Sequence, residues 1–186
     1  MIMRLGIDLG STTAKMVVMD GDGRILFRNY RRHNAKIADT LIDILREAEK
    51  EFGDVEVSAA VTGSAGLGLS ERYDIPFVQE VIASAETVRK LHPDVRTLID
   101  VGGEDSKMIF FDEKMRVDIR MNGNCAGGTG AFIDQMATLL DLDLHELESY
   151  SKRSKNVHSI ASRSGVFAKT DVRNLRARKT SKEETE

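Results

Sequence analysis

The chain lacks several features that secreted and membrane proteins need. It contains one cysteine, Cys125, and therefore cannot form a disulfide within itself, which favours a reducing compartment and predicts a cytoplasmic protein. No apolar run approaches the ~18 residues of a membrane-spanning helix, so we expect no membrane partner. Residues 1–10 contain one basic residue and an apolar run broken by Asp8, which predicts a strand and not a signal peptide.

Aromatic residues are also scarce. The 186 residues include no Trp and only 5% aromatics against 41% hydrophobic residues, which predicts an aliphatic core. Positive charge is concentrated in residues 149–182, where ten Lys and Arg accompany a single acid, for a local net charge of +9. Nucleic-acid-binding proteins usually add aromatic residues or a recognisable motif to such charge. Because neither is present, we expect a solvated or partner-facing surface and no nucleic-acid partner.

The sequence does contain an internal repeat. Residues 7–25 align with residues 99–117 at an offset of 92 without a gap, and 7 of the 19 positions are identical. The identical pairs include Asp8/Asp100, Gly10/Gly102, Lys15/Lys107 and Asp20/Asp112. We therefore predict a mixed α/β fold of two lobes, residues 1–95 and 96–186, each opening with the same β-hairpin.

Each hairpin turn has the composition of a phosphate-binding loop. Glycine lets backbone N–H groups approach an anion, and Ser11, Thr12 and Thr13 add hydroxyl donors to the first turn. Asp8 and Asp100 follow the two strands and are predicted to hold a hydrated Mg²⁺ between facing lobes. This arrangement favours phosphoryl transfer by positioning and charge neutralisation. Two ordinary Asp-Gly hairpins are the alternative.

Charged residues beside these turns have two interpretations each. Lys15 and Lys107 either contact phosphate or are solvated lysines at a strand edge. Glu104 in the second turn either acts as a base toward the attacking water or repels the phosphate. The four histidines show no ligand spacing and are interpreted as surface residues.

Hydrophobic spacing predicts the remaining elements. A helix is expected over residues 37–52, ended by Gly53, and further helices over 81–91 and 128–140. Residues 63–73 are predicted to be flexible, and residues 75–80 to form a strand. Cys125 precedes the helix at 128–140, whose free N–H groups would stabilise a thiolate. The alternative for Cys125 is a small buried hydrophobic residue.

Three motifs together resemble a known family. "GIDLGSTTAK" and "LIDVGGEDSK" resemble the two phosphate motifs of the actin/Hsp70/sugar-kinase superfamily. With "MNGNCAGGTGAFIDQMA" (121–137), the chain from residue 3 to about 180 resembles the BadF/BadG/BcrA/BcrD ATPase family. That family includes activators of 2-hydroxyacyl-CoA dehydratases and ATPase subunits of benzoyl-CoA reductase. The resemblance implies a two-lobed actin/Hsp70-like (ribonuclease-H-like) fold, with the second lobe incomplete.

The resemblance also implies cofactors, partners and site residues. A homodimer would share one [4Fe–4S] cluster, to which each subunit gives two cysteines. ATP hydrolysis with Mg²⁺ would drive electrons from reduced ferredoxin or flavodoxin onto a CoA-thioester dehydratase or reductase. The implied catalytic residues are Asp8, Asp100 and Glu104, and Cys125 is the implied cluster ligand. The implied nucleotide-binding residues are Gly10, Ser11, Thr12, Thr13, Lys15, Gly102, Gly103, Asp105, Gly127, Gly128, Thr129 and Gly130.

The sequence departs from the family pattern at three places. Ser164, before "GVFAKTDV", stands where the resemblance requires the second cysteine, so either the cluster is weakened or absent, or the sequence carries a substitution at a ligand position. Glu104 stands where members of the family commonly have glutamine. No later Gly-Gly adenosine loop is present, so we expect a truncated second lobe and weak ATP binding. A small-molecule kinase of the same superfamily and a non-catalytic regulatory module are the alternative functions.

Overall fold

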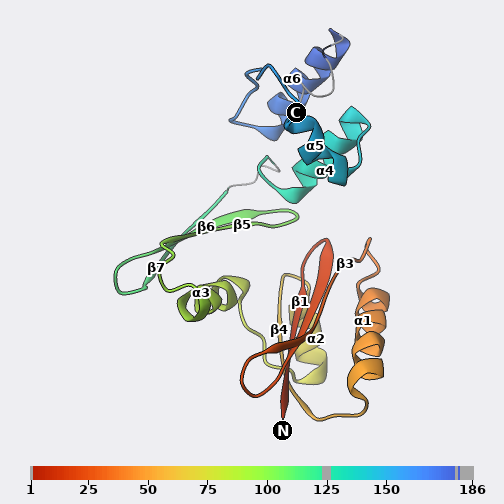
Figure 1. The fold of residues 1–186 in the computed structure, drawn as a ribbon, viewed down its shortest axis with the longest axis vertical. Helices are drawn as coiled ribbons and strands as arrows, with labels where there is room; N and C mark the ends of the chain where they lie inside the picture. The colour runs from red at the N-terminus through yellow and green to blue at the C-terminus, as the bar shows by residue number, and fades with distance from the viewer. Residues whose placement is uncertain (1, 123–126, 179, 181–186) are drawn as a thin grey trace. The chain divides into compact units, whose positions relative to one another are not determined.

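The computed structural model describes residues 2–122, 127–178 and 180 (Figure 1). Two compact units are present: Met1–Leu98 with Ile109–Val117, and Ile99–Met108 with Asp118–Glu186. The lobe boundaries predicted from the sequence, 1–95 and 96–186, stay a prediction. Within the described ranges, no helix has both the length and the apolar character needed to cross a membrane.

A four-stranded sheet organises the first unit. Its strand order is β3-β2-β1-β4, in which β1 pairs antiparallel with β2 and parallel with β4. The strands are β1 (Met3–Leu9), β2 (Thr13–Met19), β3 (Ile25–Arg32) and β4 (Val57–Thr62). Because β1 and β4 run parallel, their carboxyl ends meet at one edge of the sheet, where Asp8 lies opposite Thr62.

Helix α1 (Ile37–Phe52) covers one face of this sheet and has the predicted bounds. Leu41, Ile44 and Ala48 recur at helical spacing and pack against Ile7 and neighbouring strand residues in the core. Gly53 ends the helix at φ 70°, a left-handed value that glycine adopts without strain. Burial of this apolar stripe accounts for the agreement between prediction and structure.

The segment after β4 differs from the sequence prediction. Residues 66–73 form helix α2 (Gly66–Tyr73), and its partly buried Leu69 packs against the same core as α1. The predicted strand at 75–80 is reduced to one parallel bridge between Val61 and Phe77. The proline at 76 has no N–H to donate, which limits pairing on this side.

A second sheet follows in the order β5-β6-β7. Its strands are β5 (Thr97–Val101), β6 (Ser106–Phe111) and β7 (Val117–Met121). Helix α3 (Glu80–Leu91) precedes it and buries Ala85 and Val88 against Ile109 and Phe111. The predicted helix at 81–91 is therefore confirmed.

Three helices complete the second unit, namely α4 (Gly130–Leu140), α5 (Leu144–Ser151) and α6 (Gly165–Ala177). Helix α4 contacts both of the others. Asp143 and Glu146 form a capping box at the start of α5. The predicted helix at 128–140 is confirmed, with its first helical residue at Gly130.

Candidate functional site

The two hairpins share their turn geometry as well as their sequence. In the first turn, the Gly10 N–H donates to the Thr13 carbonyl at 2.9 Å. In the second, the Gly102 N–H donates to the Asp105 carbonyl, also at 2.9 Å. The donors of the two turns are 92 positions apart in the sequence, and so are the acceptors, which is the offset of the sequence repeat. The predicted duplication is therefore confirmed at the level of backbone hydrogen bonds.

The next turns of the two copies, at residues 20–24 and 112–116, also share their hydrogen bonds. The Asp20 and Asp112 carboxylates each accept two backbone N–H bonds from the turn that follows, at 2.8–2.9 Å. In the second copy, the backbone N–H of Arg116 and then its side chain hold the pKa of Asp112 below the ordinary carboxyl value. These local bonds explain why an aspartate occupies both positions.

Asp8 lies at the end of β1 with its two carboxylate oxygens in different environments. Its Oδ2 forms an ion pair with Lys15 Nζ at 2.7 Å across the β1–β2 ladder. Its Oδ1 is buried and has no hydrogen-bond partner among the described residues. An orphaned carboxylate oxygen suits the water shell of Mg²⁺, which rarely loses all of its waters to protein ligands. The residues at this position therefore fit a hydrated cation.

The second copy carries the same ion pair in a more buried form. Lys107 is only 5% exposed, and its Nζ lies 3.1 Å from Asp105 Oδ2 and 3.8 Å from Asp100 Oδ2. The interpretation of Lys107 as a solvated edge lysine is therefore wrong. In both hairpins the lysine contacts a carboxylate of its own hairpin, and contact with phosphate stays a prediction.

His33 is buried, so its interpretation as a surface residue is wrong. Its Nδ1 accepts the Ala35 N–H at 3.1 Å, and its Nε2 lies 3.1 Å from the Gly10 carbonyl. Since Nδ1 is an acceptor here, Nε2 carries the proton and donates to Gly10. The His33 backbone N–H also donates to Thr12. This ring therefore fixes the first phosphate loop from outside the hairpin.

Sequence reasoning also missed the turn after β4. Gly63 has φ +91°, and a Cβ there would lie 2.4 Å from the Leu9 carbonyl and 2.5 Å from Asp8 Oδ1. The Ala65 N–H donates to the same Leu9 carbonyl at 2.8 Å. The turn is thus folded against the end of β1. The sequence could have pointed to this turn only if the parallel pairing of β1 and β4 had been known, because that pairing brings the two strand ends together.

The turn at residues 102–105, the predicted second phosphate loop, is bonded directly to helix α4. The Gly130 N–H donates to the Gly102 carbonyl at 2.8 Å, and the Ala131 N–H donates to the Gly103 carbonyl at 2.9 Å. Thr129, the N-cap residue, is completely buried. The expectation that this helix offers free N–H groups is wrong for Gly130 and Ala131, because carbonyls of the loop already occupy them.

Cys125 lies outside the described residues, whereas Ser164 lies within them. Ser164 is the N-cap of α6, and its hydroxyl accepts the Val166 N–H at 3.3 Å. A Cβ added at the adjacent Gly165 would lie 3.1 Å from the Gly127 backbone nitrogen. Gly165, next to Ser164, therefore lies against Gly127, which follows Cys125 by two positions in the sequence.

The other predicted site residues differ in exposure. Thr13 is buried, while Ser11, Thr12 and Gly103 are partly buried. Glu104 is exposed in the turn between β5 and β6. Their contacts with nucleotide stay predictions.

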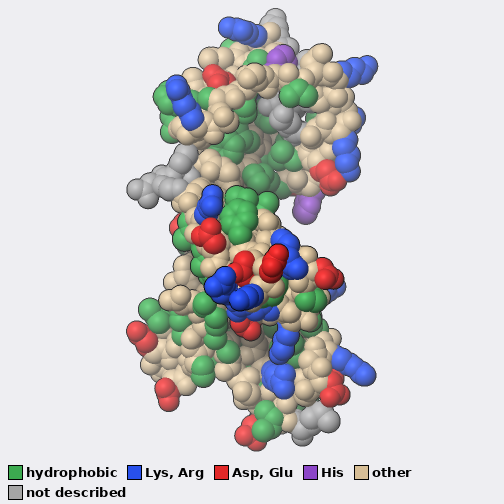
Figure 2. Space-filling model, turned by 90° about the vertical axis from the view of Figure 1, so that its left-hand side faces the viewer, with side chains coloured by type: hydrophobic (Ala, Val, Ile, Leu, Met, Phe, Trp, Pro, Cys, Tyr) green, Lys and Arg blue, Asp and Glu red, His purple; other side chains and the backbone are tan. Residues whose placement is uncertain are grey.

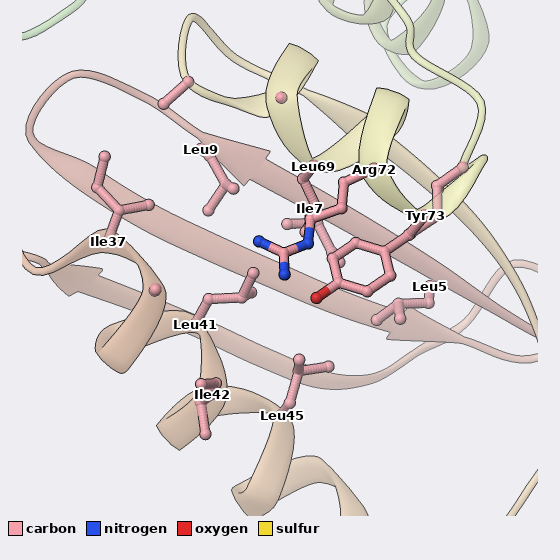
Figure 3. Close-up of a pocket in the computed structure, with 14 residues that line it drawn as sticks. Leu5, Ile7, Leu9, Ile37, Leu41, Ile42, Leu45, Leu69, Arg72 and Tyr73 are labelled. Carbon is pink, nitrogen blue, oxygen red and sulfur yellow. The ribbon is translucent and has the colours of Figure 1, made fainter.

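A large cavity in the first unit is separate from these turns. It has a volume of about 680 Å³ and lies between α1 and α2, with Arg72 and Tyr73 over its mouth (Figure 3). Its floor includes Leu5, Ile7 and Leu9. These residues alternate with Asp8 along β1, so Asp8 points to the opposite face of the sheet. The cavity is therefore not the phosphate site.

The stretch at 149–182 is rich in Lys and Arg, and the structure describes all of it except residues 179, 181 and 182. On the face of the molecule shown in Figure 2, Lys and Arg side chains are interspersed with Asp and Glu side chains. Some basic residues have local partners, such as Lys152 with Glu148 and Arg153 with the ring of Tyr150. This distribution is typical of a solvated helical surface.

Comparison with known proteins places this geometry in a family. The model of the BadF/BadG/BcrA/BcrD ATPase family matches residues 5–185. The chain belongs to that family. It is 30% identical over 176 residues to the (R)-2-hydroxyglutaryl-CoA dehydratase activating ATPase of Acidaminococcus fermentans, covering 92% of this chain and 66% of that protein. It is 29% identical to a subunit of the benzoyl-CoA reductase of Thauera aromatica, covering 96% of this chain and 65% of that protein.

A solved structure of the family has the same fold. The activator of the 2-hydroxyisocaproyl-CoA dehydratase from Clostridium difficile, with bound ADPNP, matches with a TM-score of 0.84 at 28% identity. The match covers 98% of this chain and 69% of that one. The predicted mixed α/β fold of the actin/Hsp70-like ATPases is therefore confirmed. The chain spans about two thirds of the length of these family members.

Proposed function

We propose that this chain carries the phosphate-binding core of an ATP-dependent activator of a CoA-thioester dehydratase or reductase. The observation that carries the proposal is the pair of hairpin turns with matching hydrogen bonds, in a chain that belongs to this ATPase family. We further propose a homodimer whose electron donor would be reduced ferredoxin or flavodoxin once a cluster is bound. The names of the family relatives support the dehydratase or reductase partner.

The bonds between the second phosphate loop and α4 suggest how nucleotide acts on the rest of the chain. Phosphate bound at residues 102–105 would order the loop whose Gly102 and Gly103 carbonyls accept N–H bonds from the first turn of α4. Loss of the γ-phosphate would release that loop and shift the start of α4 with it. The segment that carries Cys125 leads into this helix. We therefore propose that phosphate acts on α4 through the loop at residues 102–105.

Hydrolysis is assigned to three carboxylates. Asp8 and Asp100 would orient the waters of Mg²⁺, and the exposed Glu104 would accept a proton from the attacking water. Removing a general base typically costs about 10²–10⁴ in rate. We expect Glu104→Gln to slow single-turnover ATP hydrolysis by at least about tenfold without weakening Mg-ATP binding. Glu113→Gln, an exposed residue of the turn at residues 112–116, is the matched control.

The residues present do not match a four-thiolate cluster. Each subunit offers one thiol, Cys125, and one hydroxyl at the expected second position, Ser164. That hydroxyl is already used as the N-cap of α6. A cubane cluster usually takes four thiolates, and two subunits supply two. We therefore derive no electron-transfer step through a cluster in this chain.

Restoring the second cysteine tests this part of the proposal. Ser164→Cys removes the cap, at a cost of about 1 kcal/mol, but supplies a second thiol on the loop that lies against Gly127. We expect anaerobic reconstitution to load about four irons per dimer into the variant and substantially fewer into the unmodified chain. Ser159→Cys is the control for a thiol added elsewhere. Equal iron in all three proteins would contradict the assignment of position 164.

Nucleotide binding tests the central proposal. We expect calorimetry to detect Mg-ADP binding to the unmodified chain and a loss of at least about tenfold in Asp8→Asn. Asp22→Asn, in the exposed turn of the same hairpin, should bind as the unmodified chain does. Absence of Mg-ADP and Mg-ATP binding in the unmodified chain would refute the ATP-dependent function. Phosphorylation of a metabolite by a Cys125→Ala variant would instead favour the kinase alternative.

A further inference from the structure

Two buried side-chain oxygens lack a hydrogen-bond partner within the described part of the chain, Asp8 Oδ1 and Thr62 Oγ1. The two residues are register partners in the parallel β1–β4 ladder. Paired positions in a sheet place their side chains on the same face. Two orphaned oxygens therefore lie side by side at the edge where β1 and β4 end.

Such a pair is unusual because buried polar groups are nearly always hydrogen-bonded. One orphaned atom is readily explained by local misfit, but two neighbouring ones indicate a shared missing partner. Lys15 binds the other oxygen of Asp8, so the aspartate is charge-neutralised without Oδ1 being satisfied. The missing partner is therefore a hydrogen-bond donor, and it does not need to be a cation in direct contact with Asp8.

The turn after Thr62 holds this pair in place. Gly63 adopts φ +91°, where a side chain would collide with Asp8 Oδ1. The Ala65 N–H is bonded to the Leu9 carbonyl, and the Gly66 N–H to the Gly63 carbonyl. The backbone around Thr62 is thereby fixed before any ligand binds. Because both oxygens have almost no accessible surface, neighbouring side chains must move before a water can reach them.

We infer that Thr62 is a positioning residue for the hydrated magnesium ion of the bound nucleotide. A water bound to Mg²⁺ directs its lone pair to the metal and keeps two hydrogens to donate, and Asp8 Oδ1 and Thr62 Oγ1 are two neighbouring acceptors. Asp8 and Thr62 together therefore offer two acceptors for one such water. This inference rests on the proposed ATP-dependent function and adds a residue that neither hairpin motif contains.

The test separates the contribution of magnesium from that of the nucleotide. ADP binding is measured by calorimetry with Mg²⁺ and with EDTA for the unmodified chain, Thr62→Val and Thr62→Ser. We expect Thr62→Val, which has nearly the same shape, to reduce the Mg²⁺-dependent gain in affinity by about tenfold and to leave binding in EDTA unchanged. Thr62→Ser keeps the hydroxyl and should retain most of the gain. Ser58→Ala, an exposed residue of the same strand, is the control.

Thermal unfolding without ligand supplies a second measurement. If Thr62 Oγ1 is unsatisfied until magnesium binds, Thr62→Val should raise the Tm of the free protein by about 2–4 °C. A fall in Tm would mean that the hydroxyl already has a structural partner, and would overturn the inference. An unchanged Mg²⁺-dependent gain in Thr62→Val would overturn it while leaving the proposed function intact. No ADP binding by the unmodified chain would refute both.

Discussion

Replacing His33 by Asn or Gln should separate the two hydrogen bonds through which this buried ring holds the first phosphate loop. His33 Nε2 donates to the Gly10 carbonyl, and Nδ1 accepts the Ala35 N–H, each at 3.1 Å. A glutamine amide nitrogen reaches the place of Nε2, whereas an asparagine oxygen reaches the place of Nδ1. Each variant therefore keeps one bond and removes the other.

The magnitudes follow from the burial of the two backbone groups. Ala35 is exposed, so water replaces the lost acceptor in His33→Gln, and we expect a cost below about 1 kcal/mol. The Gly10 carbonyl is partly buried and has fewer routes to water, so His33→Asn should cost about 1–3 kcal/mol. His33→Ala removes both bonds and leaves a cavity, for about 3 kcal/mol or more.

Urea unfolding followed by circular dichroism measures these costs, and calorimetry with Mg-ADP measures their effect on the loop. The Asn variant should lose affinity for Mg-ADP, and the Gln variant should retain most of it. His158→Asn, at an exposed position, controls for the loss of a histidine as such. If Gln and Asn at position 33 have equal effects on both measurements, the bond to Gly10 does not hold the phosphate loop.

Three further predictions concern single glycines and one carboxylate. Gly63→Ala should destabilise the first unit by about 3 kcal/mol, because Gly63 has a positive φ and its added Cβ would meet an Asp8 oxygen. Gly68→Ala is the control, because its Cβ would meet no atom within 4 Å, and it should stabilise α2 slightly in the same urea unfolding assay. Gly130→Ala places a Cβ 3.2 Å from the loop carbonyl it packs on and should weaken Mg-ADP binding measured by calorimetry, and unchanged affinity would argue against coupling through α4. The pKa of Asp112 is lowered in the folded protein, mainly by the Arg116 backbone N–H. The ionised Asp112 carboxylate therefore stabilises the fold above its unfolded pKa, and this stabilisation is lost as the pH falls through the folded pKa. Carboxyl NMR titration measures the folded pKa, and the pH dependence of stability should be smaller in Asp112→Asn.

Much of the hairpin pair was predictable because its chemistry is local. Asp20 and Asp112 accept N–H groups two and four residues away, and Gly10 and Gly102 donate three residues ahead. Such bonds depend only on neighbouring residues. Because the two copies have similar local sequences, they form the same bonds in the structure. The same reasoning applies to α1, whose apolar spacing needs no knowledge of its partner.

The residues that sequence reasoning missed act across the chain. His33 contacts Gly10 from 23 positions away, and Thr62 lies beside Asp8 only because β4 pairs parallel with β1. Neither residue has a motif of its own, and an isolated histidine or threonine is most often structural. The helix at 66–73 was missed because the glycines in and before it suggested flexibility, although Leu69 anchors it in the core.

Ser164 occupies the position of the expected second cluster ligand and is also the N-cap of α6. Its hydroxyl caps α6, and the adjacent Gly165 packs against Gly127, so this part of the chain is held by contacts that involve no metal. A chain with serine at 164 therefore keeps its helix cap, whereas cysteine exchanges the cap for a thiolate. Because α4 is bonded to the second phosphate loop independently of position 164, the response of this unit to nucleotide should persist in either case. The proposed phosphate-dependent movement and the proposed binding of iron would therefore be separable in variants of position 164.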